Sequence, residues 1–167
     1  MISLIIVIGI ASYLWYLYFH DYEAKAILEN CKTNFDNAIK LENTGKVNYV
    51  DAKAGDSEDV IPVYYFSVKN TSSDDFGYVI LLEEIDGNDG CTYETRLKKE
   101  ELEYTLKLDN KTINTADLNT ISNGMITENT IKGNSVQDYA LVIKIKEGIT
   151  DFEKKHFHYK INIKEKE

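Results

Sequence analysis

The chain has 167 residues, a formal net charge of −9 and 28% charged residues. This acidic balance argues against nucleic acid as a partner, because binding to phosphates requires clustered Lys and Arg side chains. It also disfavours adhesion of the folded body to an anionic lipid surface. The length allows one domain of ordinary size with its own core, even after an N-terminal segment is set aside.

Residues 1–19 contain no charged side chain and no proline. As a helix, about 18 apolar residues rise roughly 27 Å, close to the hydrocarbon thickness of a bilayer. The rings at the end of the segment suit the headgroup level, where Trp and Tyr concentrate. We therefore expect a transmembrane anchor over residues 1–20. The anchor residues expected to contact membrane lipid are Ile2, Leu4, Ile5, Ile6, Val7, Ile8, Ile10, Leu14, Trp15, Leu17 and Phe19.

Other interpretations of this segment are weaker. A cleaved signal peptide needs a basic beginning and small residues at its cleavage site, whereas no Lys or Arg precedes Lys25 and bulky rings end the segment. A buried helix that is apolar on all faces needs a larger protein around it. A lipoprotein is disfavoured because Cys31 lies deep in the chain and follows an acidic residue, Glu29, by two positions.

The orientation of the anchor follows from opposing signals. Lys25 and Lys32 would keep the body inside the cell by the positive-inside rule. The acidic residues Asp21, Glu23 and Glu29 dilute this charge, and the body has the pattern of an exported β-domain. We expect a membrane-anchored protein whose body is extracytoplasmic, at the cell surface.

Residues 21–42 continue with helical periodicity, since apolar residues recur at spacings of three and four. Gly45 is suited to end such a helix in the left-handed conformation. We expect an amphipathic neck helix over residues 21–44, followed by a joint over residues 45–59. The apolar positions of the neck, which need the body or a second copy of the chain as a surface, are Ala24, Ile27, Leu28, Cys31, Phe35, Ala38, Ile39 and Leu41.

From residue 60 onward the hydrophobic period changes to two, which indicates β-strands. The expected strands cover residues 60–69, 76–85, 102–108, 125–131, 137–147 and 157–163. About seven short strands separated by turns describe an antiparallel Ig-like β-sandwich over residues 60–167. The inward positions are Tyr64, Phe66, Val68, Tyr78, Ile80, Leu82, Leu102, Tyr104, Leu106, Leu108, Tyr139, Leu141, Ile143, Ile145, Phe157, Tyr159, Ile161 and Ile163.

Two features have the outline of a metal site. His156 and His158 share one face of an expected strand and could form a metal pair, but only carboxylates such as Glu153 lie nearby in sequence. Solvated histidines on an outer face are favoured. Residues 86–90 (DGNDG) have the outline of a calcium loop, but its bidentate Glu is not in register, so a plain hairpin connection is favoured. We expect no metal and no cofactor.

Catalysis has no support in the sequence. No histidine lies beside a nucleophile in an elbow setting, and no glycine-rich phosphate loop follows a strand. The acidic pairs at 74–75, 83–84 and 100–101 lie in or next to expected turns, where solvated charge is the default. The sequence therefore predicts a protein that is not an enzyme.

Cys31 and Cys91 are the two cysteines of the chain. An oxidising compartment would allow them to form a disulfide. Sequence alone does not show that their Cβ atoms lie close enough, so two separate thiols remain the alternative.

Taken as a set, several strand motifs resemble the exported Ig-like β-domains of low-G+C Gram-positive bacteria that are loosely related to the TasA/camelysin group of matrix and surface-fibre proteins. The motifs occupy residues 65–71, 78–84, 104–106, 123–126, 130–133, 138–145 and 157–163. The resemblance covers roughly residues 60–163. It implies an antiparallel sandwich outside the membrane with no catalytic residues to carry over. The chain departs from this group in its uncleaved anchor and neck helix.

The order of elements is also similar to that of type IV pilins and archaeal filament subunits, in which a hydrophobic helix continues into an amphipathic half and then a β-domain. Ile5 lies where pilins carry an acidic residue, and no processing site precedes it. We expect a surface protein with a structural or adhesive role. The alternative is a homo-oligomeric filament subunit whose N-terminal helices pack in the fibre core, and a weaker one is an accessory subunit of a membrane complex.

Overall fold

The computed structural model describes residues 12–13, 16, 34–42, 47–49, 63–85, 95–151 and 155–166. The chain divides into two compact units, Met1–Asn37 and Ala38–Glu167. In the first unit, Ser12, Tyr13 and Tyr16 are helical and exposed. Helical conformation is also present from residue 34 to residue 38.

Much of the predicted N-terminal half lies outside the described residues. Within the part of the chain that the structure describes, no helix has the length and apolarity to cross a membrane. The calcium-like loop at 86–90 and the third-ligand candidate Glu153 also lie outside it. The same holds for the predicted disulfide and anchor residues, which are Cys31, Cys91, Ile2, Leu4, Ile5, Ile6, Val7, Ile8, Ile10, Leu14, Trp15, Leu17 and Phe19.

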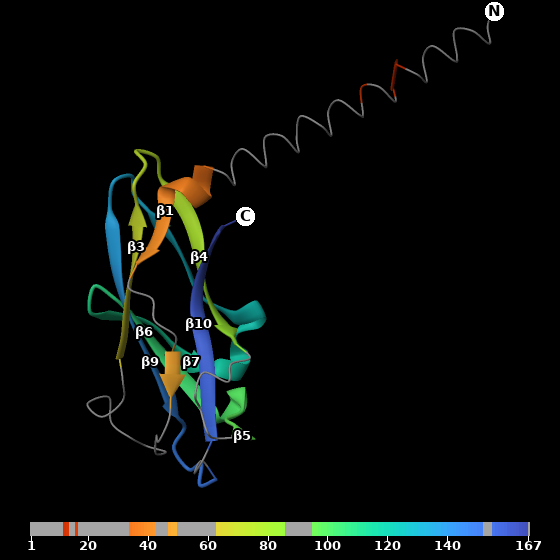
Figure 1. The fold of residues 1–167 in the computed structure, drawn as a ribbon, viewed down its shortest axis with the longest axis vertical. Helices are drawn as coiled ribbons and strands as arrows, with labels where there is room; N and C mark the ends of the chain where they lie inside the picture. Colours follow the sequence, from red (N-terminus) through yellow and green to blue (C-terminus); the bar gives the residue numbers. More distant parts are fainter. Residues whose placement is uncertain are drawn as a thin grey trace, which may run out of the picture. The chain divides into compact units, whose positions relative to one another are not determined.

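The second unit, the body, is mainly β and consists of two sheets in which every described strand pairing but one is antiparallel (Figure 1). The first sheet has the order β1 (Ile39–Glu42), β3 (Val63–Asn70), β9 (Val136–Ile145), β6 (Leu102–Leu108) and β7 (Lys111–Asp117). The second sheet has the order β2 (Val47–Tyr49), β10 (Lys155–Glu165), β4 (Phe76–Glu84) and β8 (Met125–Ile131), and β5 (Thr95–Arg96) pairs in parallel with β10. Short 3-10 helices cover Lys99–Glu101, Leu118–Thr120 and Ser122–Gly124.

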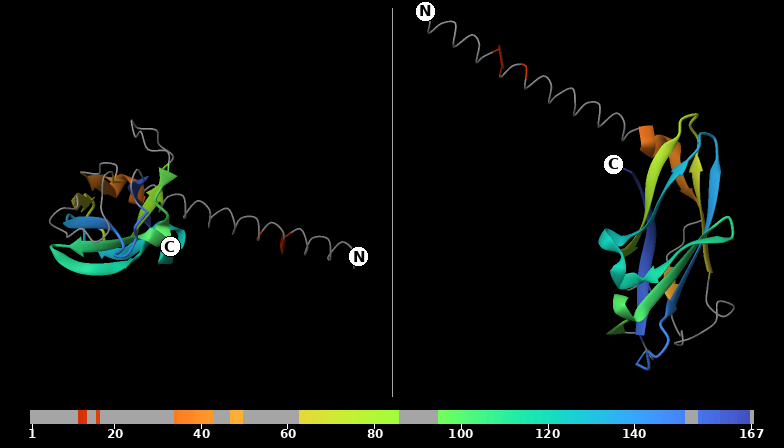
Figure 2. Two further views of the ribbon diagram at one scale, coloured as in Figure 1. Left: turned by 90° about the horizontal axis from the view of Figure 1, so that it is seen from below. Right: turned by 180° about the vertical axis from the view of Figure 1, so that it is seen from behind.

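The two sheets are stacked as two layers (Figures 1 and 2), an arrangement consistent with a β-sandwich. Side chains from both inner faces meet between them: the hydroxyl groups of Tyr78 on β4 and Tyr139 on β9 are 2.6 Å apart. Phe66 stacks on Tyr139, with ring centroids 5.1 Å apart. The period-two pattern is confirmed, because most of the predicted inward positions are buried. Strands β6 and β8 have the predicted bounds.

The central strand β9 is buried on both faces. Ala140 and Val142 are buried as well as the inward residues on either side of them. On the outer face, Ala140 lies between Tyr65 and Lys107 of the adjacent strands, and larger flanking side chains of this kind shield a small residue from solvent. Conversely, the predicted inward residues Tyr64, Leu108 and Ile163 are only half-buried because they lie near strand ends.

The predicted neck helix is wrong at its C-terminal end. Ile39–Glu42 form β1, paired antiparallel with β3 from Ile39 opposite Asn70 to Glu42 opposite Ser67. Ile39 and Leu41 fit a helical spacing, but they also alternate with Lys40 and Glu42 as a strand does. The adjacent edge of β3 satisfies the backbone groups of this segment, which the helical pattern could not reveal.

The sequence pattern also does not predict strands β2, β5 and β7, and β2 falls in the expected joint over residues 45–59. In β7 the residues are Thr-rich and mostly exposed, so no alternation of apolar side chains marks the strand. The two-residue turn before β7 places Asp109 and Asn110 at φ of 49° and 65°. This turn matches the twist of a tight hairpin and brings Lys111 opposite Leu108.

Candidate functional site

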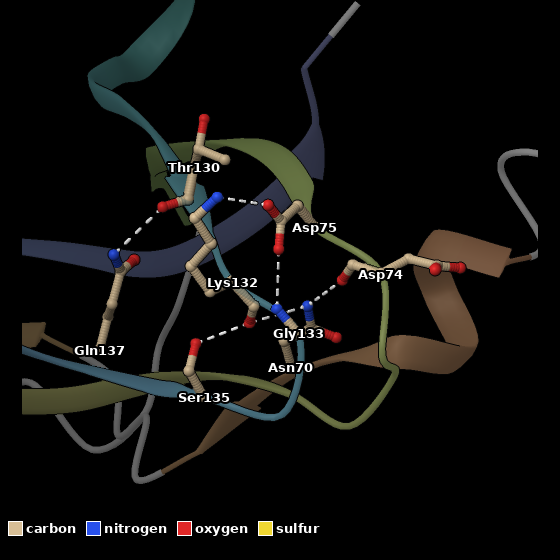
Figure 3. Close-up of polar contacts among 8 residues, drawn as sticks. All are labelled: Asn70, Asp74, Asp75, Thr130, Lys132, Gly133, Ser135 and Gln137. Atoms are coloured by element: carbon tan, nitrogen blue, oxygen red, sulfur yellow. Dashed lines mark hydrogen bonds and ion pairs between the residues drawn. The ribbon is translucent and has the colours of Figure 1, made fainter.

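Two turns that are far apart in sequence are joined by polar contacts, which Figure 3 shows in close-up. We call this cluster the turn clasp: residues 70–75, between β3 and β4, and residues 132–135, between β8 and β9. The backbone contributes bonds from the Asn70 amide to the Ser135 carbonyl oxygen (2.9 Å) and from the Asn134 amide to the Ser72 carbonyl oxygen (2.7 Å).

Asn70 is the centre of the turn clasp and is 2% exposed. Its Nδ2 donates to the carbonyl oxygens of Asp74 (2.7 Å) and Lys132 (3.1 Å). Its Oδ1 accepts the amide of Ser72 at 3.0 Å, the pattern of an Asx-turn. One buried amide therefore satisfies three backbone groups in two separate turns.

Asp75 supplies the charged part of the turn clasp. Its carboxylate accepts hydrogen bonds from Lys132 Nζ (2.5 Å) and from the Gly133 amide (3.0 Å). These bonds hold the pKa of Asp75 below its usual value, with the Lys132 bond as the larger cause. At Gly133 a Cβ atom would lie 2.1 Å from the carbonyl oxygen of Ser73, so only glycine allows the two turns to approach this closely.

The turn clasp also holds the start of β1. Both the amide and the hydroxyl group of Thr71 donate to the carbonyl oxygen of Ala38, each at 2.9 Å. Ala38 is the first residue of the body unit and directly precedes β1. The cluster thus uses its polar groups on one another and on the backbone, which indicates a structural connection rather than a reactive centre.

A second polar cluster lies between the sheets. Tyr78 hydrogen-bonds to Tyr139 and to Gln137, and Asn129 donates to the Tyr139 hydroxyl group at 3.2 Å. Burial raises the pKa of both tyrosines. These phenols are therefore neutral hydrogen-bonding groups of the core.

Nearby, Asn114 of β7 donates to the hydroxyl group of Tyr104 (2.8 Å) and to the carbonyl oxygen of Ile126 on β8 (2.9 Å). It therefore bridges the two edge strands at this side of the body.

The outer face of the first sheet presents an exposed aromatic ring. Tyr65 is 67% exposed, and since Phe66 points into the core, its neighbour Tyr65 points outward. Lys144 and Glu103 form an ion pair on this face at 2.7 Å. Ser67 donates to Asp138 at 2.6 Å. On this face the exposed ring of Tyr65 thus lies beside polar and charge-paired side chains and beside the buried apolar residues Ala140 and Val142.

The prediction that His156 and His158 are solvated is wrong. Both side chains are 5% exposed, and their ring centroids are 4.9 Å apart. They share the face of β10 opposite Phe157 and Tyr159, so both faces of this part of the strand are covered. Alternation placed the two rings on one face correctly, but it carries no information about what covers that face.

The histidine pair does not extend to a metal site within the described ranges. There, no group of three or more His, Cys, Asp or Glu side chains could hold a metal ion. Near the pair, the Arg96 guanidinium donates to Glu84 at 3.0 Å. The Glu84 carboxylate therefore forms an ion pair with Arg96.

The acidic pairs singled out in the sequence are partly engaged by lysines. Glu83 accepts hydrogen bonds from Lys160 and Asn162, which lower its pKa. Glu101 lies 3.5 Å from Lys155 Nζ. The first contacts join β4 to β10, and the second joins the 3-10 helix Lys99–Glu101 to β10, so both favour a structural role. Sequence reasoning recognised the turns at 70–75 and 133–134 but gave no signal that they meet.

Comparison with known proteins gives no family to which the chain can be assigned. A scan against protein-family models finds no match, and a search of curated proteins finds no significant relative.

Proposed function

We propose that the chain is a membrane-anchored, extracytoplasmic surface protein whose β-rich body has a structural or adhesive role and no catalytic one. The observation that carries this proposal is the uncharged segment of residues 1–19 ahead of a body built from two sheets. A segment of that length and composition suits a bilayer.

The body's relation to Ig-like domains is part of the proposal and concerns its inner strands. With β3, β4, β6, β7, β8, β9 and β10 taken as seven strands in chain order, the third pairs with the sixth and the second with the fifth, as in Ig constant-type domains. Three other strands differ: β3 pairs with β9, β10 pairs with β4, and β7 pairs with β6. In Ig constant-type domains the first strand pairs with the second, the last with the sixth, and the fourth with the fifth. The resemblance of residues 60–163 to exported Gram-positive β-domains supports the same placement outside the membrane.

Contact with a partner is assigned in this proposal to the exposed face around Tyr65 rather than to the edge strands β7 and β8. Both β7 and β8 lie at edges, and each contains a register shift relative to its neighbour. Bulges of this kind discourage the addition of a further strand. Tyr65 offers a large ring with a polar end, the kind of side chain that is enriched where proteins meet.

The test is membrane fractionation combined with protease treatment of intact cells that express the full chain. The proposal predicts that the protein stays with membranes after an alkaline wash and that external protease removes the body. A body fully protected in intact cells would reverse the orientation. Recovery of the protein in the aqueous fraction would contradict the anchor.

A filament subunit is the second candidate, because an anchor followed by an amphipathic segment could pack many N-terminal helices into a fibre core. Electron microscopy of the purified full chain separates the two. Fibres would favour the filament subunit, and single particles or small oligomers in detergent would favour a displayed surface protein.

A further inference from the structure

The two buried histidines lie where short strands attach to β10. His158 pairs with Asn48 of β2. His156 pairs in parallel with Arg96 of β5, and its carbonyl oxygen accepts the amide of Leu97 at 2.9 Å. Strand β2 has three residues and β5 has two, so few backbone hydrogen bonds hold either one. Elements of this kind open locally at lower free energy than the core.

The burial of both rings, their closeness to each other and the surroundings of His156 favour neutral imidazoles. Each side chain is 5% exposed, and Nδ1 of His156 is buried without a hydrogen-bond partner in the described part of the chain. A protonated ring would have two N–H donors and a charge to satisfy in this position. A second charge on a ring 4.9 Å away would add like-charge repulsion.

The charged groups around His156 do not offset a proton on it. Burial, then His158, then Arg96 lower the pKa of His156. Strand β2 has no charged residue; its one titratable residue, Tyr49, is paired with Phe157. The described charges near this end of β10 form ion pairs: Glu84 with Arg96 and Lys99, Lys155 with Asp151 and Glu101, and Lys160, on the same face as His158, with Glu83.

We propose that His156 and His158 form an acid-sensitive latch: their neutral rings keep β2 and β5 attached to β10, and protonation releases these two strands. In an open segment a histidine titrates near pH 6.5. The closed state binds the proton less well, so its stability is complete above about pH 6.5 and falls as the pH drops below that value. This role is separate from the proposed surface function and does not require the anchor.

NMR-detected amide hydrogen exchange on the full chain in detergent micelles, with EDTA present, tests the latch. Rates at pH 7.5 and pH 5.0 are converted to protection factors to remove the intrinsic pH effect. Tyr49 lies opposite Phe157, and its amide faces β10, because His158 turns its own backbone groups toward Ile85 and the two kinds of antiparallel pair alternate. The latch predicts that protection of the Leu97 and Tyr49 amides falls at least about tenfold at pH 5.0, while Leu141 in the core changes less than about twofold. Unchanged protection at Leu97 and Tyr49, or an equal loss at Leu141, would overturn it.

Replacement of both rings supplies the matched variant. His156→Gln combined with His158→Gln should remove the pH dependence of protection at Leu97, whereas Lys160→Gln, at an exposed position of the same strand, should retain it. Persistence of the tenfold change in the double variant would reject the histidines as its source.

If the double variant does not fold, the ring proton resonances of the wild-type protein decide the question. Both imidazoles should stay neutral until protection is lost. Protonation of the rings near pH 6.5 with protection intact would overturn the latch.

Discussion

Asn70 illustrates how a residue that marks a turn in the sequence can become a buried connector. The sequence places it at the end of a strand, next to a polar run. In the structure its amide bonds to groups of residues 72, 74 and 132. The local turn could be predicted from residue types, but the second turn that it reaches is set by strand pairing.

Substitution of Asn70 by Ala should lower the free energy of unfolding by about 2–4 kcal/mol, because it removes three hydrogen bonds and leaves backbone groups unsatisfied. Urea denaturation of the full chain in detergent, followed by circular dichroism, measures this change. Asn119→Ala, at an exposed position in the 3-10 helix after β7, is the control and should change the free energy by less than about 0.5 kcal/mol. Equal effects of the two substitutions would contradict the role of Asn70.

Asp75 should make stability depend on pH in the acid range. Its pKa is lowered from 3.8 in the folded state, so the unfolded state binds a proton more readily. The resulting stability is present above about pH 4 and is lost as the pH falls through the folded pKa. In thermal unfolding, Asp75→Asn should flatten the curve of melting temperature against pH below about pH 4. The exposed neighbour substitution Asp74→Asn should leave that curve as in the wild type; a wild-type acid response in Asp75→Asn would refute the assignment.

The buried hydroxyl group of Tyr78 should contribute to stability through Tyr139 and Gln137. Tyr78→Phe should reduce the free energy of unfolding by about 1–3 kcal/mol, since it removes buried hydrogen bonds with little change in volume. Tyr65→Phe is the matched control, because that hydroxyl group belongs to an exposed side chain, and it should be close to neutral. Urea titrations of both variants distinguish them, and a neutral Tyr78→Phe would show that the hydroxyl contact adds no net stability.

At the scale of elements, the strands that could be predicted are those with a clear alternation of apolar and polar side chains. Strands β6 and β8 match their predicted bounds for this reason. Strand β7 has exposed, Thr-rich residues, and its position depends on pairing with β6. The residues of β1 also fit a helical period, because four residues are too few to separate the two periods. The alternation of apolar and polar residues therefore identifies strands that bury one face. It does not identify strands whose position depends on backbone pairing with an adjacent strand.

The hairpin between β6 and β7 depends on two left-handed residues. Asn110 has φ of 65°, a conformation that β-branched residues adopt only with strain. Asn110→Val should lower the free energy of unfolding by about 1–2 kcal/mol, and Asn110→Gly should leave it unchanged or raise it by up to about 1 kcal/mol. Thermal unfolding gives the order of the two variants, and a more stable Val variant would contradict the turn.

At the scale of the whole molecule, the sequence predicts a β-rich body, but it places the beginning of that body at residue 60, whereas β1 and β2 also belong to the two sheets. The turn clasp could not be foreseen, because its halves, at 70–75 and 132–135, meet only through the strand order β3-β9 and β4-β8. The burial of His156 and His158 could not be predicted either. The alternating pattern shows which side chains share a face of the strand and which face is more polar, but it does not show what covers that face. The hydrogen bonds from Thr71 to the carbonyl oxygen of Ala38 connect the beginning of β1 to the turn clasp.

The central claim is that the uncharged opening segment holds this body at a membrane. Flotation of the purified full chain with phosphatidylcholine vesicles, after removal of detergent, tests it most directly. The account predicts that the protein rises with the vesicles and remains there at alkaline pH, and that Ile8→Lys, at the centre of the apolar segment, reduces this fraction. Full-length protein that stays dissolved as a monomer at the bottom of the gradient, apart from the vesicles, would contradict the claim.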